Sequence, residues 1–166
     1  MKKGSKIILS VLVVIIVLCV VYRLVNKAPS ADLESNAQME QIVASSGCIS
    51  CHSADPKLPF YANFPVAGNL VQKDVRLGHR SFDMAPMMEA LKNGEKINEV
   101  DLAKVEKVIA DGTMPLAKYY LIHWGASLTG KETQMALAWV KSQREAFYPN
   151  PLADQEWANE TVRPIQ

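Results

Sequence analysis

Cys48-Ile49-Ser50-Cys51-His52 is the stretch of sequence that decides how the rest of the chain is interpreted. Two cysteines separated by two residues and followed at once by a histidine have the spacing that c-type haem attachment requires. In such a site each thiol adds across one vinyl group of the haem, and the imidazole binds the iron from one face. We therefore predict one covalent haem c, attached through Cys48 and Cys51, with His52 as the proximal iron ligand.

Other uses of a Cys-x-x-Cys pair fit the sequence less well. A structural zinc site needs a second pair of Cys or His ligands, and the only other cysteine, Cys19, lies in an apolar run. A thioredoxin-like redox pair belongs in a βαβ unit, and no strand-like alternation surrounds this motif. A disulfide with a two-residue spacer would be strained and would constrain little of the chain. Haem attachment is the prediction that remains.

The first 25 residues have the pattern of a membrane anchor. Lysines occupy three of the first six positions, and the run from Ile7 to Tyr22 is almost wholly aliphatic. If the Arg23 side chain snorkels to the interface, the apolar helix reaches Val25 and has roughly nineteen residues, close to the length that crosses a bilayer. No good small-x-small cleavage site follows it. We therefore predict an uncleaved transmembrane helix in residues 1–25.

The charge distribution predicts the orientation of this helix and excludes one class of partner. The lysines that precede the helix keep the N-terminus in the cytoplasm and place everything after Asn26 outside. Covalent haem attachment takes place on the outer side of the bacterial inner membrane, so orientation and motif agree. We expect a single-pass inner-membrane protein with a periplasmic haem domain. With a net charge of +1 and no clustered basic stripe, the chain does not have the pattern of a nucleic-acid-binding protein.

The remainder of the chain has helical periodicity and predicts an all-α domain over residues 37–147. Residues 26–36 form a tether, and residues 148–166 form an extended, proline-containing tail or linker. Asn98 is a good N-cap, and Thr129 with Glu132 has the spacing of a capping box. A loop that holds Phe60, Tyr61 and Phe64 could cover a haem edge, pack these rings beneath itself, or do both. The helices are expected at about 37–47, 67–79, 86–92, 98–112 and 129–147.

The second axial ligand must come from a segment far from His52 in sequence. Met114 lies in Gly112-Thr113-Met114-Pro115, a loop between the last two helices, and a thioether held by a stiff loop suits an electron carrier. Ligation by Met and His raises the reduction potential relative to two histidines, whereas an open position permits gas or peroxide chemistry. We predict Met114 as the sixth ligand. The alternatives that remain open are His79, His123, Met84, Met87 and Met88.

The order of the haem motif, a buried helix pair, Met-Pro and a capped last helix resembles the cytochrome c fold. Three stretches resemble more closely the membrane-anchored N-terminal haem domain of trihaem bacterial cytochrome c peroxidases, also called quinol peroxidases, and the small haem-binding domain proteins related to it. These stretches are residues 47–53, residues 58–62, and residues 112–115 with the downstream Tyr120, His123, Trp124, Leu128 and Thr129.

This resemblance implies the function of the domain and its partners. In that family the N-terminal haem is similar to an electron entry site that takes electrons from the quinol pool and passes them to a two-haem peroxidase portion. This sequence has one haem motif, and residues 159–166 resemble the linker that precedes the peroxidase portion. We therefore expect an electron carrier rather than an enzyme, with quinol or a quinol-oxidising complex as donor. The expected acceptor is a periplasmic peroxidase or related reductase.

Two other functions remain open. One is a haem-based sensor that binds a ligand at an open sixth site. The other is peroxidase activity, either in this chain alone or as the haem domain of a truncated peroxidase.

Overall fold

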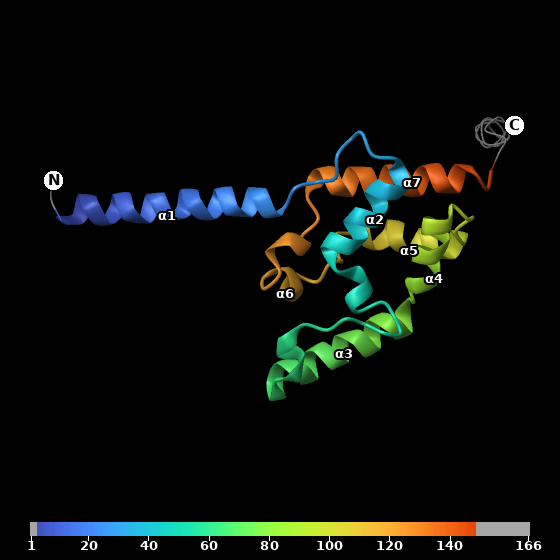
Figure 1. Cartoon of the computed structure of the whole chain (residues 1–166), viewed down its shortest axis with the longest axis horizontal. Helices are drawn as coiled ribbons and strands as arrows, with labels where there is room; N and C mark the ends of the chain where they lie inside the picture. The colour runs from blue at the N-terminus through green and yellow to red at the C-terminus, as the bar shows by residue number, and fades with distance from the viewer. Residues whose placement is uncertain (1–2, 149–166) are drawn as a thin grey trace, which may run out of the picture.

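In the computed structural model, which describes residues 3–148, every regular element is helical (Figure 1). The apolar helix α1 (Lys3–Val25) precedes a domain of further α-helices and three short 3-10 helices. This arrangement confirms the predicted all-α class with one N-terminal apolar helix. The predicted tail lies, from Pro149 onwards, outside the described residues. The domain contains α2 (Ser35–Ser46), η1 (Cys48–Ser50), η2 (Phe60–Asn63), α3 (Pro65–Ser81), α4 (Ala85–Asn93), α5 (Glu99–Ala110), α6 (Ala117–Tyr120), η3 (Trp124–Ala126) and α7 (Gly130–Glu145).

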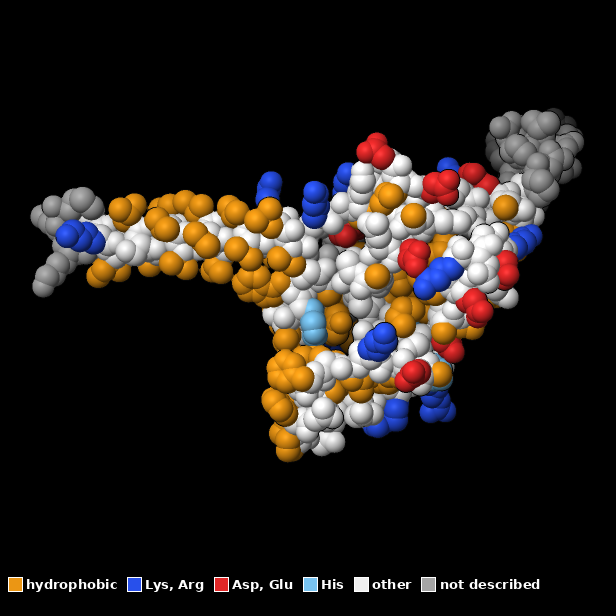
Figure 2. Space-filling model, viewed as in Figure 1, with side chains coloured by type: hydrophobic (Ala, Val, Ile, Leu, Met, Phe, Trp, Pro, Cys, Tyr) orange, Lys and Arg blue, Asp and Glu red, His pale blue; other side chains and the backbone are white. Residues whose placement is uncertain are grey.

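Helix α1 projects away from the domain (Figure 1), and its surface is almost entirely apolar (Figure 2). The segment Gly4–Val25, 22 residues long, is long and apolar enough to cross a membrane, and none of its most apolar part is buried against the domain. An exposed helix of this composition has a large hydrophobic surface that water solvates poorly. The finding is compatible with a single-pass anchor.

The hydrophobic core lies among α2, α4, α5 and α7. Helix α7 packs against both α2 and α5, and α2 also packs against α4. These helices bury their apolar stripes because the periodicity of their sequences puts the large aliphatic side chains on one face. The most deeply buried large side chains are Met39, Ile42, Val43, Met87, Leu102 and Val140.

Two helices begin where their capping residues predict. The Asn98 Oδ1 atom accepts a hydrogen bond from the Val100 backbone N–H at 2.8 Å. The Thr129 hydroxyl accepts from the Glu132 backbone N–H at 3.2 Å, and the Glu132 carboxylate accepts from the Thr129 N–H at 2.7 Å. These bonds satisfy N–H groups that have no partner within the helix. The N-cap and the capping box are therefore confirmed.

Helix α3 departs from the expectation. It is longer than the predicted 67–79, and Val66, Leu70 and Leu77 on its apolar stripe are exposed rather than buried. The reason is that α3 packs mainly against η2 and does not enter the four-helix core. The rings of Phe60 and Phe64 are exposed as well, so of the two open alternatives for this loop, packing of these rings beneath it does not hold.

Residues 117–126 contain two short elements that the sequence analysis does not predict. Helix α6 (Ala117–Tyr120) and η3 (Trp124–Ala126) each have a single turn. Hydrophobic periodicity needs a longer window before it indicates a helix, so segments of this length give no signal.

A buried hydrogen bond between α7 and α2 gives a test of the core. The Trp139 indole N–H donates to Asn36 Oδ1 at 2.8 Å, and Trp139 is buried. Replacing Asn36 by alanine should lower the free energy of unfolding by about 1–3 kcal/mol, because the buried indole N–H loses its acceptor. Urea unfolding of the detergent-solubilised chain, followed by far-UV circular dichroism, measures the change.

Asn69→Ala is the matched control, since Asn69 is also helical but exposed on α3. Asn69→Ala removes the same amide from a helix without removing the acceptor of a buried donor, so only Asn36→Ala should destabilise. Equal unfolding midpoints for the two variants would show that the Trp139 contact does not contribute.

Candidate functional site

The haem-type motif sits on a tight turn at the end of α2. Helix α2 ends at Ser46, and Gly47 takes the left-handed conformation with φ of 69°. The Cys48 carbonyl oxygen then accepts hydrogen bonds from the N–H groups of Cys51 at 3.2 Å and His52 at 3.0 Å. A Cβ atom at Gly47 would also collide with the Tyr119 hydroxyl, so a side chain there would require the Tyr119 ring to move. The turn therefore holds both cysteines and the histidine within one compact loop.

The His52 imidazole is fixed by the backbone that joins α3 to α4. Its Nδ1 atom lies 2.9 Å from the Phe82 carbonyl oxygen, and the His52 carbonyl oxygen accepts from the Met84 N–H at 2.8 Å. A carbonyl oxygen can only accept, so Nδ1 carries the proton and donates it. The neutral ring then presents the lone pair of Nε2, the atom that a metal-bound histidine uses when Nδ1 is tied to a carbonyl.

Burial raises the pKa of both thiols of the motif. Neither Cys48 nor Cys51 forms a disulfide. Burial raises the pKa of the Cys48 thiol, although the Ser46 hydroxyl, 3.0 Å from its Sγ, acts in the opposite direction. Burial also raises the pKa of Cys51, and the negative charge of Asp74 adds to this effect. Redox-active cysteine pairs have a lowered pKa, so this pair does not have the electrostatics of a thioredoxin-like site.

Helices α3 and α6 enclose the motif on the side of Cys51. A Cβ atom at Gly78 of α3 would lie 2.6 Å from the Cys51 carbonyl oxygen, so the helix approaches the turn as closely as a glycine allows. The Lys118 ammonium of α6 binds the Asp74 carboxylate of α3 at 2.7 Å. This ion pair joins the two helices beside the motif, and Lys118 lowers the Cys51 pKa against the effect of Asp74.

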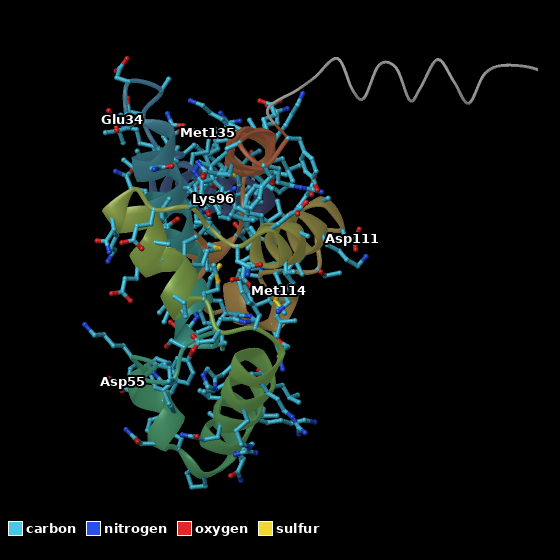
Figure 3. All side chains as sticks on the ribbon, turned by 90° about the vertical axis from the view of Figure 1, so that its right-hand side faces the viewer. Glu34, Asp55, Lys96, Asp111, Met114 and Met135 are labelled. Atoms are coloured by element: carbon cyan, nitrogen blue, oxygen red, sulfur yellow. The ribbon has the colours of Figure 1, made fainter. Side chains whose placement is uncertain are left out.

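Met114 differs from the other methionines of the described chain. Met39, Met84, Met87 and Met88 belong to the core cluster, and Met135 packs against it. Among residues 3–148, Met114 is the one methionine that takes no part in this cluster. It is half-buried on the loop between α5 and α6, at a height between α5 and α3 in Figure 3. Its thioether is therefore not needed to fill the core.

The two alternative histidines have other partners. His79 is exposed on the last turn of α3, and its Nε2 lies 3.4 Å from the Asp83 carboxylate. His123 Nδ1 lies 3.1 Å from the Tyr119 carbonyl oxygen, and its Nε2 lies 3.3 Å from the Tyr61 hydroxyl. The His123 ring also stacks on Tyr119, with 4.2 Å between the ring centroids. Both nitrogens of His123 are thus occupied in this structure.

Several groups that shape the site could not be predicted from the sequence. The Phe82 carbonyl that orients His52 is a backbone atom thirty positions away, and no side-chain pattern identifies it. The Asp74–Lys118 pair joins two ordinary surface charges 44 positions apart. Gly47 was recognisable in principle, because a glycine directly before the first cysteine suggests a constrained turn.

The sequence is similar to that of known haem proteins. Residues 11–142 match the model of the haem-binding domain family. The chain is 31% identical over 145 residues to the cytochrome c peroxidase Ccp of Escherichia coli strain K12, and the alignment covers 84% of this chain. The chain spans 31% of the length of that relative. No solved structure shows a significant match. The chain therefore belongs to the haem-binding domain family and is a haem protein.

Proposed function

We propose that this chain is a membrane-anchored monohaem c-type cytochrome that carries electrons on the periplasmic side of the inner membrane. The observation that carries the proposal is the hydrogen bond from His52 Nδ1 to the Phe82 carbonyl oxygen, in the same turn as Cys48 and Cys51. It orients an imidazole for ligation through Nε2, as in haem proteins with a proximal histidine. The apolar helix α1 supports the anchor.

The residues present fit a covalently held haem. Cys48 and Cys51 would form the two thioethers, His52 would hold the iron from one face, and Met114 would hold it from the other. When bound, haem supplies a one-electron couple between ferric and ferrous iron. The chain's own contribution is to keep His52 in one tautomer and orientation. Gly47 and Gly78 let Tyr119 and α3 approach the motif closely.

The donor and acceptor in this proposal follow from the anchor and the relative. A haem domain tethered to the membrane lies within reach of lipid-soluble quinol or of a quinol-oxidising complex. The Escherichia coli relative is called a cytochrome c peroxidase, and this chain spans 31% of it. A periplasmic peroxidase or related reductase is therefore the proposed acceptor. The chain itself contributes electron transfer rather than the reduction of peroxide.

Covalent attachment is tested by the mass of the mature chain. Co-expressed with a cytochrome c maturation system, the unaltered chain should carry one haem that survives denaturation and acid–acetone extraction. Cys48→Ser with Cys51→Ser should lose it, because no thioether can form. Intact-protein mass spectrometry measures the difference.

Cys19→Ser is the control for this experiment, since Cys19 is exposed on α1 and far in sequence from the motif. This variant should keep its haem. A mature chain without added porphyrin, or with both motif sulfurs open to alkylation, would contradict the c-type assignment.

The sixth ligand is tested by replacing Met114 with leucine, which keeps the size of the side chain and removes the sulfur. The ferric protein should lose its sulfur-to-iron charge-transfer band in the far red. Its reduction potential should fall, because the thioether stabilises the ferrous state. The ferrous variant should also bind carbon monoxide rapidly through the vacated position. Absorption spectroscopy and a redox titration record these changes.

Met135→Leu provides the comparison, because Met135 is also half-buried but packs against the core. It should leave the band and the potential unchanged. If the band persists in Met114→Leu, another residue is the ligand. Rapid binding of carbon monoxide by the unaltered ferrous chain would favour a sensor with an open sixth site.

A further inference from the structure

Two segments of the domain are free of charged side chains although charged residues make up 21% of the chain. The first runs from Leu58 to Gln72 and includes η2 and the beginning of α3. The second runs from Tyr119 to Gly130 and includes η3. Neither contains an Asp, Glu, Lys or Arg, and lysines lie directly before and after each. Surface segments of this length usually carry charge, so these two call for a physical explanation.

The apolar side chains of these segments are exposed. Their exposed fractions are 77% for Phe60, 54% for Phe64, 77% for Val66, 71% for Leu121, 67% for Ile122 and 44% for Trp124. Such side chains, grouped together, mark a surface that contacts a protein or a membrane. We name these six residues the apolar face.

Hydrogen bonding and ring contacts join the two halves of the apolar face. The Tyr61 hydroxyl in η2 lies 3.3 Å from His123 Nε2, and the two ring centroids are 5.8 Å apart. The Phe60 ring packs edge-on against Tyr61 and Phe64. Segments whose contacting residues are 62 positions apart in sequence are therefore joined side by side.

The end of α1 is attached to the same surface. The Tyr22 hydroxyl lies 3.1 Å from the Ser127 hydroxyl, which in turn donates to Asn26 Oδ1 at 2.9 Å. Close to these bonds, a Cβ atom at Gly125 would lie 3.1 Å from a Val25 methyl group. In Figure 1, α6 and the beginning of α3 lie on the side of the domain from which α1 projects. Figure 2 shows hydrophobic side chains gathered along that edge.

We propose that the apolar face docks on the lipid bilayer that α1 crosses, so that the domain rests on the membrane surface instead of moving freely on its tether. A helix that spans the bilayer and leaves the domain at this face must bring the lipid surface next to it. Aromatic and aliphatic side chains without neighbouring charges are the composition that enters the interfacial layer. The proposal rests on the membrane-anchored function in one respect, namely that α1 spans the bilayer.

Labelling from within the lipid tests this docking. The full haem-loaded chain is reconstituted in phospholipid vesicles that contain a photoreactive diazirine lipid, illuminated, and digested with trypsin for mass spectrometry. Trypsin cleaves after lysine and arginine. The informative peptides are therefore 7–23 for α1, 58–73 and 119–131 for the apolar face, and 97–104 for α5. Peptides 7–23, 58–73 and 119–131 should carry label. Peptide 97–104 should not, although it contains the exposed Val100.

A double variant, Phe60→Asp with Ile122→Asp, should reduce the label on peptides 58–73 and 119–131 to the level of peptide 97–104. It should leave the label on peptide 7–23 unchanged. Val100→Asp is the matched control and should change none of the labelled peptides. Because all three side chains are exposed, the variants should keep the haem absorption spectrum and helical circular dichroism of the parent, which confirms that they fold.

The possible outcomes distinguish docking of the apolar face on the bilayer from insertion of α1 into it. Label on peptide 7–23 alone would contradict the docking proposal but would agree with the proposed membrane-anchored cytochrome. In that case cross-linking between chains in the same vesicles would assign the apolar face to a second copy. No label on peptide 7–23 would overturn the anchor and the docking together. Label on the apolar face that persists in the double variant would also overturn the docking.

Discussion

The hydrogen bond between His52 Nδ1 and the Phe82 carbonyl oxygen is the constraint on which the site depends. It connects the haem motif to the short segment between α3 and α4, and the bond from the Met84 N–H to the His52 carbonyl reinforces the connection. Met84 is buried in the core, so the segment that orients the imidazole is itself held by core packing. The position of the His52 imidazole is therefore decided by the helices that surround the motif as much as by the motif itself.

The sequence predicts the parts of this structure that depend on local interactions. The N-cap of α5 and the capping box of α7 are formed by side chains and backbone groups within three residues of each other, and both are confirmed. The motif with its three candidate residues can likewise be recognised without a fold. The bond from His52 to the Phe82 carbonyl cannot, because any residue type supplies a carbonyl and only the fold brings this one into place.

The apolar stripe of α3 predicts the helix correctly but its burial wrongly. The structure leaves Val66, Leu70 and Leu77 exposed. Periodicity reports which side chains share a face of a helix and does not report what covers that face. For the part of the stripe near η2, a lipid surface is the cover that fits the absence of charge. Met114 shows the converse: its place in a loop between helices already separated it from the core methionines, and the structure leaves it outside the core cluster.

Tyr119 links the apolar face to the haem motif. Its hydroxyl lies against Gly47, and its ring stacks on His123, which in turn contacts Tyr61. These contacts connect the motif, through Tyr119 and His123, to Tyr61 in the segment that carries Phe60. A domain that docks through the apolar face would hold its haem motif at a fixed, short distance from the lipid. Since electron transfer slows steeply with distance, such docking would favour a donor dissolved in the membrane over one that diffuses in the aqueous phase.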